Sequence, residues 1–149
     1  MQGFTLIELI ITLVILVMLA SIGIPPFLDF IRNQNVKRGG YEVMANLSYA
    51  RSEAIKRNGS VTITPVDASN WEDGWSITSG GNTLRVLNEL EGLDITGPAA
   101  AFSFTGNGRT SSVSFEICDE NRSASVEKRT VSLDSVGRAE NEITGICGP

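Results

Sequence analysis

The chain begins with a long run of apolar positions. Between Phe4 and Ile24 lie 21 residues, of which only Glu8 is charged. As an α-helix, a run of this length extends about 30 Å, the thickness of the hydrocarbon core of a bilayer. A carboxylate at the centre of a bilayer costs roughly 2.5–3.5 kcal/mol, and less near an edge. The run therefore predicts an apolar helix whose single acid needs a cationic partner.

A second helical pattern follows two prolines, Pro25 and Pro26. Proline inside a helix removes a hydrogen bond and bends the axis. Beyond the prolines, small and apolar residues recur at alternating spacings of four and three, which places them on one helix face. These positions are Val36, Gly40, Val43, Leu47, Ala50 and Ala54. We therefore expect the helix to kink near Pro25, to stop at Asn58-Gly59 and to pack its small face closely against a sheet.

From Val61 onward the period becomes that of β-strands. Alternation predicts strands at residues 61–64, 74–78, 83–87, 102–104, 113–117 and 130–133. Gly80-Gly81-Asn82 and Gly106-Asn107-Gly108 lie between strand candidates and are typical of hairpin turns. The expected fold class is α+β, with a long N-terminal hydrophobic helix packed against an antiparallel β-sheet head.

Charge and composition reduce the range of possible functions. The net charge of −5 is uneven: residues 4–57 hold six basic and four acidic side chains, whereas residues 58–149 hold six and thirteen. An acidic head argues against a broad nucleic-acid-binding surface. The absence of histidine from the sequence removes the commonest general base and metal ligand. Because no nucleophile–base pair, metal cluster or cofactor loop is visible, we expect no enzymatic activity, no metal and no cofactor.

Three kinds of segment could explain the apolar run. A secretory signal peptide would need a shorter core, a basic start and a small-residue cleavage site, which Met18-Leu19-Ala20 does not provide. A plain membrane anchor has the right length but leaves Glu8 unexplained. A helix that leaves the bilayer to pack against copies of itself explains both features, if cleavage before Phe4 creates an amine that neutralises a neighbour's Glu8.

The stretch Gly3-Phe4-Thr5-Leu6-Ile7-Glu8-Leu9 resembles the processing signature of type IV pilins and pseudopilins. The resemblance implies that the prepilin peptidase cuts between Gly3 and Phe4 and methylates the new amine of Phe4. It also implies that Glu8 meets the Phe4 amine of an adjacent subunit during filament assembly. The implied segments are a leader remnant (1–3), a transmembrane or filament-core helix (4–28), an amphipathic half (29–58) and a β-rich periplasmic head (59–149).

The same resemblance implies a single-pass protein of the bacterial inner membrane, incorporated into a pilus or pseudopilus with other pilin or pseudopilin subunits. Its orientation rests on the resemblance alone. Met1-Gln2-Gly3 carries no Lys or Arg, whereas Arg32, Lys37 and Arg38 follow the apolar run. The positive-inside rule by itself would predict the reverse orientation.

Two further stretches narrow the family. Ala50-Arg51-Ser52-Glu53-Ala54-Ile55-Lys56-Arg57-Asn58 resembles the corresponding stretch of FimT/FimU-type minor pilins, which are grouped with the type II secretion pseudopilin H. Physically, we expect this stretch to be a helix end with a solvated charged face. Trp71-Glu72-Asp73-Gly74-Trp75 resembles a W-x-x-G-W element of the same family. Two tryptophans that bracket a turn are more often packing anchors than a ligand site.

Cys118 and Cys147 are the only cysteines, and both lie in the predicted head. A head exported as the resemblance implies would meet an oxidising compartment, in which the pair is expected to form a disulfide. Paired cysteines near the C-terminus also match the pilin pattern. Closing a loop of about 30 residues would stabilise the fold by roughly 3–4 kcal/mol. A catalytic role would normally require a histidine partner.

Three functions remain open. The first is a structural minor pilin that helps to initiate or assemble a type IV pilus, and the second is an H-type pseudopilin of type II secretion. The third is a minor pilin that binds DNA for uptake, for which the family pattern is Gly-Arg-x-Arg near the C-terminus. Gly137-Arg138-Ala139-Glu140 has an acid in place of the second arginine. We therefore expect no nucleic-acid partner. Between the other two functions we expect the first, because the Pro25 region and residues 50–58 look more like the pilus branch of the family.

Overall fold

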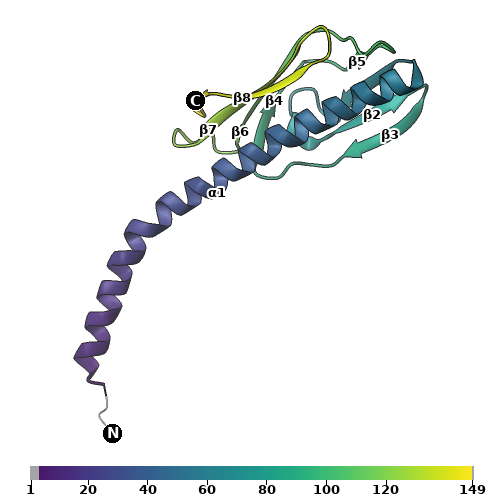
Figure 1. Ribbon diagram of the computed structural model, residues 1–149. Helices are drawn as coiled ribbons and strands as arrows, with labels where there is room; N and C mark the ends of the chain where they lie inside the picture. Colours follow the sequence, from purple (N-terminus) through teal and green to yellow (C-terminus); the bar gives the residue numbers. More distant parts are fainter. Residues whose placement is uncertain (1–3, 149) are drawn as a thin grey trace.

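The computed structural model describes residues 4–148, without the side chains of residues 21–26. Its longest element is the helix α1 (Leu6–Arg57), whose N-terminal half projects away from a β-rich head while its C-terminal half lies along that head (Figure 1). The helix ends at Asn58, which has a left-handed φ of 47° and donates its backbone N–H to the carbonyl groups of Ala54 and Ile55. The predicted stop at Asn58-Gly59 is confirmed.

The head, as far as the structure describes it, contains two four-stranded antiparallel sheets. Sheet A has the order β3-β2-β1-β5 and consists of β1 (Val61–Pro65), β2 (Trp75–Ser79), β3 (Asn82–Leu87) and β5 (Phe102–Phe104). Sheet B has the order β4-β6-β7-β8 and consists of β4 (Leu93–Thr96), β6 (Val113–Asp119), β7 (Glu127–Leu133) and β8 (Ala139–Ile146). A short 3-10 helix, η1 (Trp71–Asp73), precedes β2. The α+β fold class is confirmed.

All six predicted strands are present, with ends that differ by up to three residues, but β4 and β8 were not predicted. β8 is an edge strand of sheet B, and most of its side chains are exposed. Because little of it is buried, its sequence AENEITGI carries no clear apolar alternation. β4 does alternate, with Leu93 and Ile95 buried, but only over four residues. Such a short run gives a weak signal.

The two glycine turns have different outcomes. Gly80 and Gly81, with φ values of 55° and 82°, connect β2 to β3, as expected for a hairpin turn with two positive φ angles. The prediction of a hairpin at Gly106-Asn107-Gly108 is wrong, because β5 and β6 on either side belong to different sheets. The segment does form a turn, in which the Gly108 N–H donates to the Thr105 carbonyl at 2.7 Å. This turn carries the chain from one sheet to the other.

The predicted small face of α1 is buried against the sheets. All six of its members are buried: Val36, Gly40, Val43, Leu47, Ala50 and Ala54. A Cβ added at Gly40 would lie 2.9 Å from the side-chain nitrogen of Asn141 in β8. A Cβ at the neighbouring Gly39 would lie 2.5 Å from a methyl carbon of Leu93 in β4. Glycine at these two positions lets sheet B approach the helix closely, as expected.

The tryptophans of the W-x-x-G-W element are packing anchors. Trp71 is fully buried and donates its indole N–H to the Pro98 carbonyl at 3.0 Å. Its ring meets Phe115 edge-on, with 4.9 Å between the two ring centroids. The centroids of the Trp71 and Trp75 rings are 5.8 Å apart. Gly74 between them has a φ of 99°, a conformation that favours glycine. These contacts agree with the packing interpretation.

Candidate functional site

The N-terminal end of α1 is organised by a helix cap. Thr5 is the N-cap residue, and its side chain accepts a hydrogen bond from the Glu8 backbone N–H at 3.3 Å. Thr5 and Glu8 have the Thr-x-x-Glu spacing of a capping box, a signal that the sequence analysis missed. Glu8 is exposed in the first turn, where the helix dipole favours an acid. Among the described residues, Glu8 has no ion-pair partner. Gly3, on the other side of the predicted cut, lies outside the described residues.

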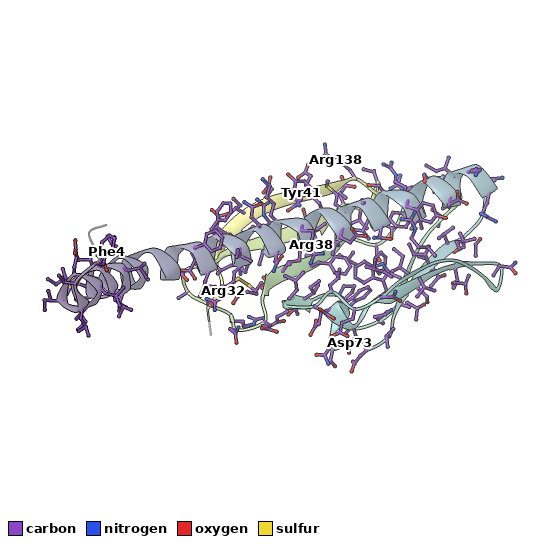
Figure 2. All side chains as sticks on the ribbon, turned by 90° about the horizontal axis from the view of Figure 1, so that it is seen from below. Phe4, Arg32, Arg38, Tyr41, Asp73 and Arg138 are labelled. Carbon is purple, nitrogen blue, oxygen red and sulfur yellow. A yellow bond between two sulfur atoms is a disulfide. The ribbon has the colours of Figure 1, made fainter. Side chains whose placement is uncertain are left out.

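We call residues 4–31 the stem. Every described large apolar side chain of the stem is exposed, with exposed fractions between 41% at Ile31 and 84% at Phe4. The exposed side chains surround the helix on all sides (Figure 2). They are Phe4, Leu6, Ile7, Leu9, Ile10, Ile11, Leu13, Val14, Ile15, Leu16, Val17, Met18, Leu19, Phe27, Leu28, Phe30 and Ile31. An apolar surface of this extent marks an interaction surface.

The side chain of Pro25, the predicted kink position, lies outside the described residues. The backbone is helical across this position, so the helix is not broken there. Figure 1 shows that the axis of α1 curves between the stem and the part that lies along the head. A kink caused by Pro25 itself stays a prediction. Within the described residues, no helix is both long enough and apolar enough to span a membrane.

Arg51 differs from the expected solvated face. Its side chain is half-buried and donates to two backbone carbonyl groups, those of Gly108 at 3.3 Å and Val136 at 2.9 Å. The two carbonyl groups belong to separate loops of the head. Arg51 therefore ties both loops to α1, and the prediction of a purely solvated charged face is wrong at this position.

Glu53 is also buried rather than solvated. Its carboxylate accepts from Arg57 at 2.8 Å and from Lys56 at 3.4 Å, both within the last turn of α1. The hydrogen bond from Arg57 lowers the pKa of Glu53, against the opposing effect of burial. A lowered pKa means that the folded state favours the carboxylate. The interaction therefore contributes stability at neutral pH, which is lost as the pH falls through the lowered pKa.

The Gly137-Arg138-Ala139-Glu140 segment leads into β8. Arg138 is exposed, but its guanidinium lies between two acids, 3.5 Å from Asp134 and 3.4 Å from Glu140. Glu140, the acid that replaces the arginine of the DNA-uptake pattern, is thus a direct partner of Arg138. Gly137 is buried with a φ of 78°, and a Cβ there would lie 2.2 Å from the Gly108 carbonyl oxygen. Gly137 is therefore tightly packed, and the charge of Arg138 is neutralised by its two acidic partners.

The predicted disulfide is present. Cys118 at the end of β6 is bonded to Cys147, which follows β8 directly, with 5.6 Å between their Cα atoms. Both cysteines are buried, and the Cys147 N–H donates to the Val126 carbonyl at 2.7 Å. The bond fixes the C-terminal end of the edge strand β8 to the end of β6, an inner strand of sheet B.

We expect the double variant Cys118→Ser/Cys147→Ser to lose roughly 3–4 kcal/mol of unfolding free energy, because the crosslink restricts a long loop in the unfolded chain. Urea unfolding of the full chain in detergent micelles, with and without reductant, would measure the loss. In the native protein, alkylation under denaturing, non-reducing conditions should find no free thiol. Two alkylated cysteines would contradict the disulfide.

Comparisons with known proteins identify the family. The family model described as Type II transport protein GspH matches residues 41–137. The chain belongs to the GspH family. A second model, described as the prokaryotic N-terminal methylation motif, matches residues 1–24, which include Gly3, Phe4 and Glu8. A comparison with curated proteins finds no significant match.

Solved structures of a minor pilin and of a minor pseudopilin share the fold. A crystal structure of the type IV minor pilin FimU from Pseudomonas aeruginosa has 24% identity and a TM-score of 0.66, covering 80% of this chain and 99% of FimU. A second crystal form of FimU has 25% identity and a TM-score of 0.63, and the match covers 75% of this chain and 99% of FimU. The minor pseudopilin EpsH of the Vibrio cholerae type 2 secretion system has 13% identity and a TM-score of 0.58. This match covers 73% of this chain and 97% of EpsH.

The family of this chain is one of structural pilins and pseudopilins, whose members normally assemble with other such subunits. The methylation motif and the family indicate a pilus or pseudopilus component anchored by its N-terminal helix.

Proposed function

We propose that this chain is a structural minor pilin that takes part in the assembly or initiation of a type IV pilus through its N-terminal helix. The observation that carries the proposal is the uncovered stem, an apolar helix with a single acid, Glu8, near its start. The head covers none of the described large apolar side chains of this stem. Such a surface needs lipid around it before assembly and the helices of neighbouring subunits afterwards.

In this proposal Glu8 and Phe4 form the assembly site. Cleavage between Gly3 and Phe4 places a cationic amine next to the capped first turn of α1. That amine pairs with Glu8 of an adjacent subunit, because a carboxylate within an apolar filament core needs a cation. Before assembly, the chain lies in the bacterial inner membrane as a single-pass protein with its head in the periplasm. The disulfide supports that location, since disulfides persist in oxidising compartments.

The type IV pilus is favoured over type II secretion by two observations. Identity with FimU is 24–25%, whereas identity with EpsH is 13%. Residues 50–58 also resemble the FimT/FimU stretch. The alternative, an H-type pseudopilin, is favoured by the GspH family match itself.

Purification of the tagged full chain from membranes of strains that lack either the pilus or the secretion machine would decide between the two functions. Loss of pilin partners only in the pilus-deficient strain supports the proposal, and loss only in the secretion-deficient strain overturns it.

We expect N-terminal mass analysis of membrane-extracted protein to find a chain that begins at a methylated Phe4. The reason is the Gly3-Phe4 junction with an acid at the fifth position after it. A strain without the prepilin peptidase supplies the control and should yield the uncut chain. An intact Met1 in cells that contain the peptidase would contradict the prediction.

We expect the full chain in detergent micelles to bind duplex DNA no more tightly than about 10 μM at physiological salt, because phosphate binding requires several available cations. Arg138 is engaged by Asp134 and Glu140, and Lys128 lies 3.4 Å from Glu116. A mobility-shift titration would measure the affinity, with Arg138→Ala as the control. Tighter binding that Arg138→Ala abolishes would make DNA uptake the leading function.

A further inference from the structure

The edge strand β8 carries two exposed isoleucines. Ile143 has 52% exposure and Ile146 has 63%. The other exposed large apolar side chains of the described head, residues 59–148, are Val66, Val86 and Val136. Each of these valines lies in a different part of the head: after β1, in β3 and in the loop before β8. Within the described head, the isoleucines are therefore the one pair of exposed large apolar side chains that share an element.

A shift of register turns both isoleucines to the same face of sheet B. Residues three apart on a regular strand point to opposite faces. The pairing of β8 with β7 is shifted here, so that Ile143 lies opposite Arg129. Ile146 lies opposite Glu127, which is two residues from Arg129 on β7. Because residues two apart share a face, and directly opposite residues do so as well, the two isoleucines lie on one face.

That face is the one that packs against α1. Arg129 donates to the Asn141 side chain at 3.3 Å, and a Cβ added at Gly40 of α1 would contact the same Asn141 side chain. Ile143, two residues beyond Asn141, continues this face along the edge of the sheet. The exposure of Ile143 and Ile146 shows that α1 does not cover the face there.

The uncovered face lies at the end of the head from which the stem projects. Figure 1 shows β8 running toward that end. Glu127, which lies opposite Ile146, donates its backbone N–H to the Asn33 side chain of α1 at 2.8 Å. Asn33 is two positions beyond Ile31, the last residue of the stem. The contact of α1 with β7 opposite Ile146 is thus less than one helical turn from the stem.

The stem is longer than the hydrocarbon core of a bilayer. Residues 4–31 extend about 42 Å as a helix, whereas the core is about 30 Å thick. A helix of excess apolar length is accommodated by tilting. Arg32, the first Lys or Arg of the sequence, lies where the stem meets the head (Figure 2) and pairs with Asp29 at 3.2 Å. Burial of the last apolar side chains, Phe30 and Ile31, therefore places the membrane surface near Arg32 and the base of the head in the headgroup layer.

We propose that Ile143 and Ile146 dock the base of the head onto the membrane surface before the subunit enters a filament. The inference rests on the proposed function, since it specifies how a subunit anchored by its stem holds its head. A tilted stem lowers one side of the head toward the bilayer, and the isoleucines identify the β8 edge as that side. The stem alone leaves the head free to rotate about the stem axis, whereas a second contact fixes its orientation.

Two observations favour lipid as the occupant of this face. The face is continuous with the end of the stem, which lipid surrounds in the proposed function. Its surroundings are also acidic, because Glu127 and Glu142 are exposed beside the isoleucines. The contact is therefore apolar rather than an attraction to anionic headgroups, and we expect it with zwitterionic lipid.

Tryptophan fluorescence can locate the isoleucines relative to lipid. The two native tryptophans, Trp71 and Trp75, are buried, so their signal can be subtracted from that of a chain with an added exposed tryptophan. The full chain is reconstituted into phosphatidylcholine vesicles that carry bromine, a contact quencher, on the acyl carbons nearest the headgroup. Relative to vesicles without bromine, Ile143→Trp and Ile146→Trp should each show a loss of the added fluorescence.

Val136→Trp provides the matched control. Val136 is also exposed, but its loop is tied by Arg51 to the part of α1 farthest from the stem. Its added fluorescence should be the same in both kinds of vesicle. In the Ile146→Trp chain, a second change Ile143→Asp should abolish the quenching, because an acid opposes burial in lipid. The second change Val136→Asp should leave the quenching intact, and so should the addition of anionic lipid.

Phe27→Trp, in the stem, separates this proposal from the proposed function. If Phe27→Trp is quenched but Ile143→Trp and Ile146→Trp are not, the docking is rejected and the anchoring by the stem stands. The vesicles contain only this chain, so isoleucines that are covered by another subunit in the filament would give this result. Equal quenching of Val136→Trp would also overturn the docking, since the head would then have no preferred side. If Phe27→Trp itself is not quenched, the membrane stage of the proposed function fails together with the docking.

Discussion

Glu8→Ala should reduce incorporation of this chain into filaments by about tenfold or more, while its amount in the membrane stays the same or rises. The first effect follows because the Phe4 amine of the neighbouring subunit loses its partner. Two unit charges 4 Å apart attract by about 4 kcal/mol at an effective dielectric constant of 20. Even half of that energy exceeds about 1.4 kcal/mol, the free energy that corresponds to a tenfold change in an equilibrium constant. The second effect follows because a costly acid has been removed from the apolar segment.

The measurement is the ratio of tagged subunit in sheared filaments to tagged subunit in the membrane fraction. Glu8→Gln serves as the matched control, since it keeps the shape of the side chain but removes the charge, and it should behave like Glu8→Ala. Glu8→Asp keeps the charge and should retain more incorporation than either. Normal incorporation of Glu8→Ala would mean that the acid has no role in assembly.

The parts of the molecule that the sequence predicted correctly are those whose signal is local. The small face of α1 could be recognised because Val36, Gly40 and Val43 recur with helical spacing, and such a stripe has one physical use, close packing. Glu8 was noticed for a local reason too, because a charge within an apolar run needs an explanation wherever the chain folds, but its role in assembly stays a prediction. Gly80-Gly81 could be assigned because a two-residue hairpin needs positive φ angles.

The role of Arg51 could not be predicted in the same way. Its partners are the backbone carbonyl groups of Gly108 and Val136, which lie 57 and 85 residues further along the chain. Every residue has a carbonyl group, so the sequence contains no complementary side chain that would reveal the contact. The edge strand β8 was missed for a related reason. It is held by backbone pairing with β7 and by the disulfide that follows it, and neither depends on apolar alternation.

Trp71→Ala should destabilise the head by about 3–5 kcal/mol, the range for removing a large buried aromatic side chain. Total stabilities of about 5–15 kcal/mol are usual for natural domains, so this single change removes a large part of the margin. Trp71 has 0% exposure, meets Phe115 edge-on and satisfies the Pro98 carbonyl, so truncation leaves both a cavity and an unpaired acceptor. Urea unfolding of the full chain in detergent micelles, followed by near-ultraviolet circular dichroism, would measure the loss.

Trp71→Phe separates the two contributions. It keeps an aromatic ring against Phe115 but removes the indole N–H, which leaves the buried Pro98 carbonyl without its donor. The expected cost is therefore smaller, about 1–3 kcal/mol for one unsatisfied buried group. If the tryptophan pair were instead a ligand site, Trp71→Ala would leave the unfolding free energy unchanged. A head that stays as stable as the native one after Trp71→Ala would thus contradict the packing role, because a fully buried indole cannot be removed from a close-packed core without cost.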